Sequence, residues 1–321
     1  MATVSKFVNG SQRFTDPVEA RLKAAIARLG YRSNAHARST ATGETRIIGI
    51  AVLDLCNPHF TSIIKGANRI ALQFGYTVLL IDLEESLSRQ HVLIDTLAHR
   101  VDGIVLSTRI VEEEMAKLAT LRKPVVFINH AGNDSQITSV SADNELAGFM
   151  LAQHLLNRGY REIGFLGYPV ASGNAPRLAG VRRCLASAGL SPRVFEAGSP
   201  STAAGELAGS SILLGPMRPQ ALICFNDLIA IGVLKEIKAL GTAGSNDIAV
   251  CGFDNISHCQ YTHPQLTSVD MQSEKLGEIA MLRVLDALAG QPSEGTTLLE
   301  PRLIMRESTP IFQSGDMTIE K

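Results

Sequence analysis

From residue 47 onward the sequence alternates short apolar runs with amphipathic stretches, and this alternation limits the fold more than any other feature. Four runs are rich in β-branched residues and nearly continuous in apolar character, as in strands buried on both faces: IIGIAVLD (47–54), YTVLLID (76–82), GIVLS (103–107) and PVVFIN (124–129). Helical spacing separates them over residues 58–74, 85–99 and 112–121. This βαβα order predicts a parallel, doubly wound α/β sheet.

A second series of the same kind follows the first. Its strands are IGFLG (163–167), ALICF (221–225) and IAVCGF (248–253), with helices near 144–158, 177–188, 227–240 and 273–289. The chain of 321 residues is 45% hydrophobic, enough for two cores, so two similar lobes fit this length better than one large sheet. A groove between them would collect the loops at the carboxyl ends of the strands, where ligands bind in such folds.

Residues 1–46 differ in kind from the rest. They contain eight Lys and Arg against three Asp and Glu, a net +5, so the remainder carries −6 of the chain's net −1. The pattern predicts a helix over 15–31, then a small-residue segment, SNAHARST (33–40), and a joint, ATGET (41–45). A basic segment on an acidic body is typical of contact with a polyanion, and the charge pattern fits a solvated helix equally well.

The remaining composition excludes several classes of protein. Five scattered cysteines without a C-x-x-C pair indicate a reduced, cytoplasmic protein with no disulfide frame or zinc site. No export signal and no apolar run near ~18 residues is present, so we expect no membrane segment. Nor does the chain contain G-x-G-x-x-G, a P-loop, G-x-S-x-G or metal-spaced ligands, so we expect no cofactor, no metal and no enzyme. Five isolated histidines are expected at the surface: His91, His99, His154, His258 and His263.

An ordered set of short motifs runs along nearly the whole chain. They are ATVSKFVNG (2–10), LGYRSNAHARS (29–39), NPHF (57–60), RVDGIVL (100–106), ADNELAG (142–148), HLLNRGYREIGFLG (154–167), RLAG (177–180), FNDLIAIGVL (225–234), GFDN (252–255), LTSVDM (266–271) and RESTP (306–310). Each is weakly specific alone, but in this order they resemble the LacI/GalR family of bacterial transcriptional repressors. The resemblance implies a helix-turn-helix, a hinge helix that enters the DNA minor groove, and a periplasmic-binding-protein-like core that closes on a small effector.

Carried onto this sequence, the resemblance implies a division with three crossings between the lobes. The parts are a partial helix-turn-helix (1–32), a hinge helix and linker (33–45), an N-terminal lobe (46–141 plus 271–300), a C-terminal lobe (142–270 plus 301–312) and a tail (313–321). The family has a first helix before its recognition helix, and the sequence given lacks a counterpart. Either the true start codon lies upstream and the native protein binds operators normally, or this product has lost much of its DNA affinity; we expect the first.

At the DNA end, the family's recognition helix matches ATVSKFVNG. This match implies that Lys6 donates to base edges or phosphate, and that Thr3, Ser5 and Asn9 donate to phosphate oxygens, although Thr3 and Ser5 could instead cap a helix. In the hinge, Asn34 and Arg38 keep the family pattern. The position of the leucine that wedges into the minor groove is Thr40, so we expect weaker kinking of operator DNA.

At the effector end, the resemblance points first to the C-terminal lobe. Arg177 matches the ligand-gripping arginine, whose planar fork fits vicinal hydroxyls, a carboxylate or a phosphate. Asp254 matches the acceptor for effector hydroxyls, with a cap or turn aspartate as the alternative. Asn226 follows another strand and can both donate to and accept from a hydroxyl, whereas Asp227 could cap the next helix.

The N-terminal lobe adds candidates at its own strand ends. Asn57 and Asn129 could bond the ligand, and Phe60 could stack on an apolar sugar face or simply pack in the core. With one arginine, one aspartate and neutral amides, the set suits a polyol more than a dianion. The chain has no tryptophan, which disfavours a purine sandwich, so we expect a sugar or sugar derivative as the effector.

The family mechanism is a population shift. An effector bound between the lobes would bias their closure, and a homodimer reading a pseudo-palindromic operator would pass that bias to its hinges. The alternative is a sugar-binding protein of the solute-binding type that does not bind DNA; it shares the two-lobed core but predicts an export signal.

Overall fold

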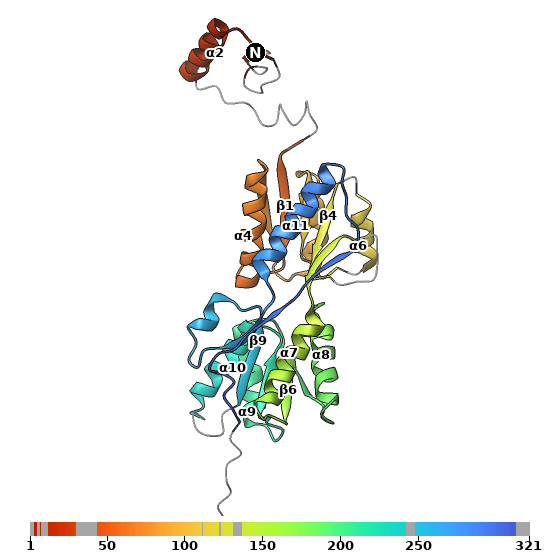
Figure 1. Ribbon diagram of the computed structural model, residues 1–321, viewed down its shortest axis with the longest axis vertical. Coiled ribbons are helices and arrows are strands. Elements are labelled where there is room, and N and C mark those ends of the chain that lie inside the picture. The colour runs from red at the N-terminus through yellow and green to blue at the C-terminus, as the bar shows by residue number, and fades with distance from the viewer. Residues whose placement is uncertain are drawn as a thin grey trace, which may run out of the picture.

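A computed structural model describes residues 3–4, 7, 12–29, 44–110, 112–121, 123–130, 137–241 and 248–312. Two α/β lobes are stacked along the long axis, and helix α2 (Asp16–Leu29) lies beyond the end of the first lobe (Figure 1). The predicted fold class, two parallel-sheet lobes, is confirmed. Within the described residues, no helix combines the length and apolar character needed to cross a membrane.

The first lobe is built on a six-stranded parallel sheet in the order β11-β5-β4-β3-β1-β2. Helices α4 (Pro58–Gln73) and α11 (Ser273–Leu288) cover one face, and α5 (Leu87–Ala98) and α6 (Glu112–Ala119) cover the other. The strands are β1 (Ile47–Val52), β2 (Thr77–Asp82), β3 (Gly103–Leu106), β4 (Val125–Ile128), β5 (Ser139–Ala142) and β11 (Thr296–Leu299). The central strands β3 and β4 are buried throughout, as their continuous apolar runs predict.

The second lobe repeats this plan in the order β12-β10-β9-β8-β6-β7. Its helices are α7 (Asn144–Asn157) and α8 (Asn174–Ala186) on one face, and α9 (Thr202–Leu214) and α10 (Asp227–Ala239) on the other. Its strands are β6 (Ile163–Gly167), β7 (Arg193–Glu196), β8 (Ala221–Cys224), β9 (Ala249–Phe253), β10 (Thr267–Asp270) and β12 (Arg302–Ile304), and a 3-10 turn η1 spans Ser257–Gln260. The short edge strand β12 runs antiparallel to β10, which departs from an all-parallel prediction.

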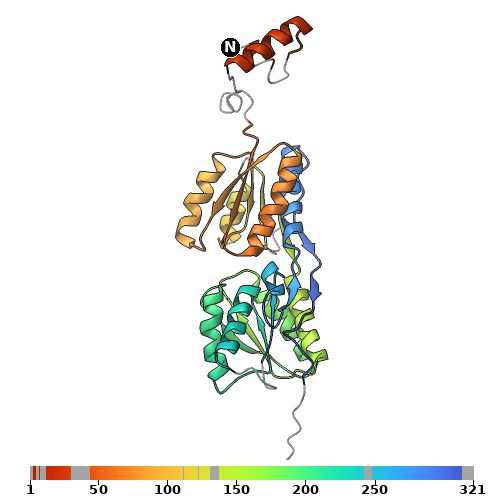
Figure 2. The same ribbon diagram turned by 90° about the vertical axis from the view of Figure 1, so that its left-hand side faces the viewer.

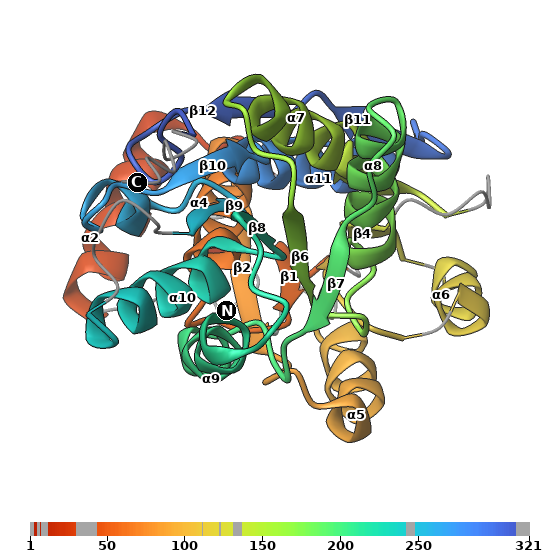
Figure 3. The ribbon, with the colours of Figure 1, turned by 90° about the horizontal axis from the view of Figure 1, so that it is seen from below.

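The chain crosses between the lobes at three short connections, from β5 to α7, from β10 to α11 and from β11 to β12. These segments hold one another: Asp143 N donates to Leu299 O at 3.0 Å, and Gln272 Nε2 donates to Glu300 O at 2.6 Å. They follow one side of the molecule (Figure 2). Seen from below, α5 and α9 lie on the side away from β11 and β12 (Figure 3), so the lobes are tethered on one side only.

Candidate functional site

A small cavity of about 60 Å³ lies between the lobes, at the carboxyl ends of strands from both sheets. All six residues predicted to bind an effector line it, namely Asn57, Phe60, Asn129, Arg177, Asn226 and Asp254. Ligand pockets for small molecules measure ~300 Å³ or more, whereas this one holds only a few waters. The lobes are therefore closed on each other, and a sugar-sized molecule enters only if they separate.

Arg177 is the centre of the second-lobe wall. Its guanidinium is buried: Nε donates to Asn144 Oδ1 at 2.9 Å, Nη1 donates to the Phe225 carbonyl, and Nη2 lies 3.7 Å from Asp254 Oδ1. The rings of Phe225 and Phe253 lie 4.7 and 4.5 Å from its Cζ. Burial lowers the pKa of Arg177 and the Asp254 carboxylate raises it, but an arginine stays charged in proteins.

Close packing of α7 against α8 sets the position of Arg177. A Cβ atom at Gly148 of α7 would lie 2.0 Å from the Arg177 carbonyl oxygen, so only glycine lets the two backbones approach this closely. The same approach brings Asn144, the first residue of α7, within hydrogen-bonding distance of the Arg177 side chain.

Asp254 projects from a left-handed turn after β9. Its φ is 101° and that of Asn255 is 49°, conformations that cost free energy in residues other than glycine. Asp227, fully buried beneath, holds the loop: its Oδ2 accepts from Ile256 N at 2.9 Å and its Oδ1 from Ser268 Oγ at 2.7 Å. Burial, followed by the charge of Asp254, raises the pKa of Asp227 to about 7.

The amide residues at the cavity also act within the fold. Asn226 Oδ1 accepts from Ile229 N at 2.9 Å and caps α10, so the alternative that Asp227 is the cap is wrong. Asn57 caps α4 by accepting from His59 N at 3.0 Å. Phe60 packs in the first-lobe core, as one of its two alternatives predicted, and it also lines the cavity, so stacking on a sugar face stays a prediction.

His59 is the contact that sequence reasoning missed. It sits in the first lobe, and Asn129 Nδ2 donates to its Nε2 at 3.0 Å. The other nitrogen, Nδ1, lies 2.8 Å from Ser273 Oγ and 3.6 Å from Asp254 Oδ1 across the cleft. Burial lowers the pKa of His59 more than Asp254 raises it, so the ring is neutral at pH 7. Its position inside NPHF, directly after a strand, was the available signal.

Two further contacts join the cavity walls. Ser172 Oγ donates to the Asn129 carbonyl at 2.9 Å. The guanidinium of Arg109, paired with Glu85, stacks on the Tyr168 ring of the second lobe, with Cζ 5.0 Å from the ring centroid. Neither Arg109 nor Glu85 was predicted, although both follow first-lobe strands and both line the cavity.

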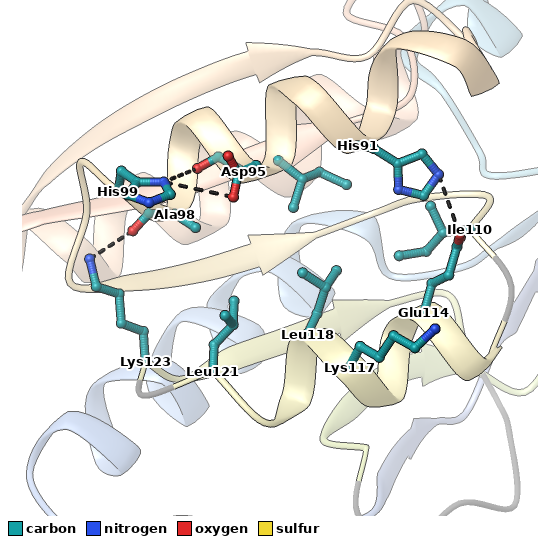
Figure 4. A pocket seen from close by; sticks show the side chains of 11 residues that line it. His91, Asp95, Ala98, His99, Ile110, Glu114, Lys117, Leu118, Leu121 and Lys123 are labelled. Carbon is teal, nitrogen blue, oxygen red and sulfur yellow. Dashed lines mark hydrogen bonds and ion pairs between the residues drawn. The ribbon is translucent and has the colours of Figure 1, made fainter.

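A larger hollow of about 650 Å³ lies between α5 and α6 of the first lobe (Figure 4). Its apolar lining includes Ile94, Ile110 and Leu118, and its rim groups pair with one another. His91 Nε2 lies 3.5 Å from Glu114 Oε1, and Lys123 Nζ donates to Ala98 O at 2.7 Å. Because these polar groups are matched locally and do not converge, the interlobe cavity is the better candidate site.

Little of the predicted DNA-binding set falls within the described residues. Thr3 is helical and exposed, whereas Ser5, Lys6, Asn9, Asn34, Arg38 and Thr40 lie outside the described residues. The ring of Phe7 contacts that of Phe14 edge-on at 6.0 Å. Helix α2 has no fully buried residue.

Among the described residues, no group of three or more His, Cys, Asp or Glu side chains is arranged to hold a metal ion. The expectation that all five isolated histidines lie at the surface is wrong for His154. That side chain is buried, and its Nε2 lies 2.8 Å from Thr309 Oγ1.

Comparisons with known proteins agree with this geometry. Residues 152–309 match the family model of a periplasmic binding protein-like domain. The chain is 30% identical over 317 residues to catabolite control protein A of Priestia megaterium, covering 96% of this chain and 95% of that protein. It is 29% identical over 314 residues to the repressor CytR of Escherichia coli K12, covering 96% and 92%.

The same fold is found in a crystal structure of the lac repressor dimer bound to operator and the anti-inducer ONPF, with a TM-score of 0.88, 25% identity, and coverage of 96% of this chain and 95% of that one. Fold and cleft together define a two-lobed ligand-binding protein of the periplasmic-binding-protein type. Within that class, the chain belongs to the LacI/GalR family of transcriptional regulators, and the predicted family is confirmed.

Proposed function

We propose that this chain is a ligand-responsive, DNA-binding transcriptional repressor that acts as a homodimer in the cytoplasm and catalyses no reaction. Family membership supports the proposal, and the curated relatives that the chain matches include the transcriptional repressors CytR and PurR. The similar lac repressor structure is a dimer on operator DNA, which supports a pseudo-palindromic operator for this chain as well.

We further propose the division of labour that the family implies. Residues 1–32 would read DNA, 33–45 would form the hinge, 46–141 plus 271–300 and 142–270 plus 301–312 would form the effector-binding lobes, and 313–321 would be a tail. Strand membership supports the lobes: β11 extends the first sheet and β12 the second. In the DNA segment, Lys6 would donate to base edges or phosphate in the major groove, and Thr3, Ser5 and Asn9 to phosphate oxygens. In the hinge, Asn34 and Arg38 would contact the DNA backbone and minor groove.

The effector is, in this proposal, a neutral sugar or sugar derivative. The observation that carries it is charge balance in the cavity: Arg177 faces Asp254 and Arg109 is paired with Glu85, so the walls have no surplus charge for an anion. Asn57, Asn129 and Asn226 add neutral amides, which can both donate to and accept from hydroxyls. A dianion would leave its charge unmatched in a desolvated site.

Calorimetry against a panel of neutral sugars, sugar phosphates and purines tests the effector. We expect a neutral sugar to bind, and Arg177→Ala to weaken that binding at least ~100-fold, since buried charged hydrogen bonds to a ligand are lost. The matched control is Arg183→Ala on the same helix, whose exposed side chain pairs with Glu145 and should leave binding unchanged. Binding of purines alone would contradict the proposal.

Selection of binding sites from random duplexes, followed by fluorescence anisotropy, tests DNA binding. We expect a pseudo-palindromic site whose affinity changes when the sugar is added, and Lys6→Ala to weaken binding. Sugar binding without any DNA affinity would instead support the solute-binding type of protein. On the selected site, Thr40→Leu should increase the DNA bend angle by restoring the wedge.

A further inference from the structure

Arg109 and Tyr168 contact each other across the cleft, and neither is among the residues proposed to bind the effector. Arg109 follows β3 of the first lobe, and Tyr168 follows β6 of the second. The guanidinium Cζ lies 5.0 Å from the centroid of the tyrosine ring, which is the geometry of a cation–π contact. Only 6% of the Arg109 side chain is exposed.

The first lobe holds Arg109 in place before Tyr168 is considered. Glu85 Oε2 accepts from Arg109 Nε at 2.5 Å and also pairs with Nη2, so the carboxylate contacts the edge of the guanidinium. The backbone is fixed as well, because Arg109 N donates to Oε1 of the buried Gln90 at 3.2 Å. With its edge occupied, the guanidinium presents a flat face for stacking.

The second lobe holds Tyr168 equally well. Its backbone N donates to Asn174 Oδ1 at 2.7 Å, and its ring packs edge-on against Phe225 at 6.1 Å. Both halves of the contact are thus positioned within their own lobes. Closing the lobes brings them together without a further loss of side-chain freedom, which makes the contact more favourable than one between mobile side chains.

We propose that Arg109 and Tyr168 form an interlobe clasp that holds the cleft closed before any effector binds, with Glu85 as its positioning residue. The clasp joins the lobes using this chain's own side chains, and the cavity beside it measures only about 60 Å³. When the lobes separate, the guanidinium face and the ring are both returned to water. The clasp therefore opposes opening and sets the fraction of molecules that can admit an effector.

The test uses the full chain without effector and does not rest on the proposed function. In a Cys56→Ser background, fluorophores are attached at Thr96→Cys on α5 and Ala203→Cys on α9, both exposed positions, and single-molecule energy transfer reports the open-to-closed ratio. Arg109→Ala and Tyr168→Ala should each raise this ratio about 10-fold, as expected for a desolvated cation–π contact. Tyr168→Phe keeps the ring and should leave the ratio unchanged.

A double-mutant cycle separates a clasp from a general loss of packing. The variant with both alanines should open no more than either single variant, because each removes the same contact. Arg109→Lys keeps the charge beside Glu85 but lacks the planar face, so it should also open, and it guards against unfolding in the alanine variants. Three results would overturn the proposal. The effects of the two alanine substitutions on the open-to-closed ratio could add, Arg109→Lys and Arg109→Ala could both leave the ratio unchanged, or the parent chain could already be open.

Discussion

In the second lobe, the charged groups at the cavity are held in place by contacts within that lobe, although Asp254 also faces His59 across the cleft. Arg177 bonds Asn144 and the Phe225 carbonyl, and Asp227 holds the loop that carries Asp254. In the first lobe, by contrast, His59 and Arg109 reach the opposite wall for part of their contacts. The second lobe therefore presents a binding surface that exists before closure, whereas the first lobe completes its contacts only when the lobes meet.

The lobes are nevertheless built alike, since in each of them a glycine allows two helices to pack closely. Substituting these glycines should have the largest effect on stability. A Cβ at Gly148 would lie 2.0 Å from Arg177 O, and one at Gly277 would lie 1.9 Å from Ile63 O. We expect Gly148→Ala and Gly277→Ala each to reduce the free energy of unfolding by about 3 kcal/mol, measured by urea denaturation. Gly198→Ala, which meets no atom within 4 Å, is the control and should change it little. If only one lobe proved sensitive, the structural equivalence of the two helix pairs would be wrong.

Asp227 should make the stability of the second lobe depend on pH. Its pKa of about 7 lies above its ordinary value of 3.8, so its contribution to stability is full below pH 4 and is lost as the pH rises through 7. We expect Asp227→Asn to remove this loss, flattening the stability profile between pH 4 and 7 by ~2 kcal/mol or more. Urea midpoints measured across that range give the slope. A slope equal to the parent's would mean that Asp227 is ionised throughout at no cost.

The sequence predicts the part of the site that depends on local structure, but not the contacts between residues far apart in the chain. Asn57, Asn129, Asn226 and Asp254 follow strands, and strand ends of parallel sheets meet at one edge, so their place at the cavity was predictable. The role of His59 was not, because Ser273 and Asp254 lie some 200 residues away along the chain.

The same limit applies to other residues. Nothing near Arg109 indicates that Tyr168 will face it, since that depends on how the two lobes close. The antiparallel direction of β12 was equally hidden, because a strand of three residues, one exposed and two half-buried, is too short for a pattern that would distinguish it. Local caps, such as Asn226 on α10, compete with a neighbouring aspartate of similar propensity, and only the backbone geometry decides between them.

His59 should make closure itself depend on pH, because its surroundings change when the lobes meet. In the closed form, burial lowers the pKa of His59 below 6.5; the Asp254 carboxylate raises it by less, and the charge of Arg177 lowers it further. The ring is also hydrogen-bonded to Ser273 and Asn129. An open cleft would return the ring to water and its ordinary pKa, so protons favour opening. We expect the closed fraction to fall as the pH drops below 6.5, by at most tenfold per pH unit, the limit for one proton.

The energy-transfer pair at positions 96 and 203 measures this dependence. His59→Gln should remove it, because an amide does not titrate in this range. His154→Gln is the control: His154 is also buried with a lowered pKa, but it lies within the second lobe, so its loss should change stability and leave closure unaffected. Closure that is as sensitive to pH in His59→Gln as in the parent would show that another group carries the proton.

The smallest effect is expected from Ser172, whose Oγ donates to the Asn129 carbonyl across the cleft at 2.9 Å. The serine is exposed, so water can replace its hydrogen bond, and Ser172→Ala should raise the open-to-closed ratio only about 3-fold. Ser187→Ala is the matched control, since that hydroxyl donates to Cys184 O at 2.7 Å within one helix of the second lobe. Equal effects of both substitutions on the open-to-closed ratio would contradict this difference between the lobes, because a hydrogen bond within one lobe should not affect closure. An effect of Ser172→Ala as large as that of Arg109→Ala would instead mean that closure rests on the rim hydrogen bond and not on the stacked arginine.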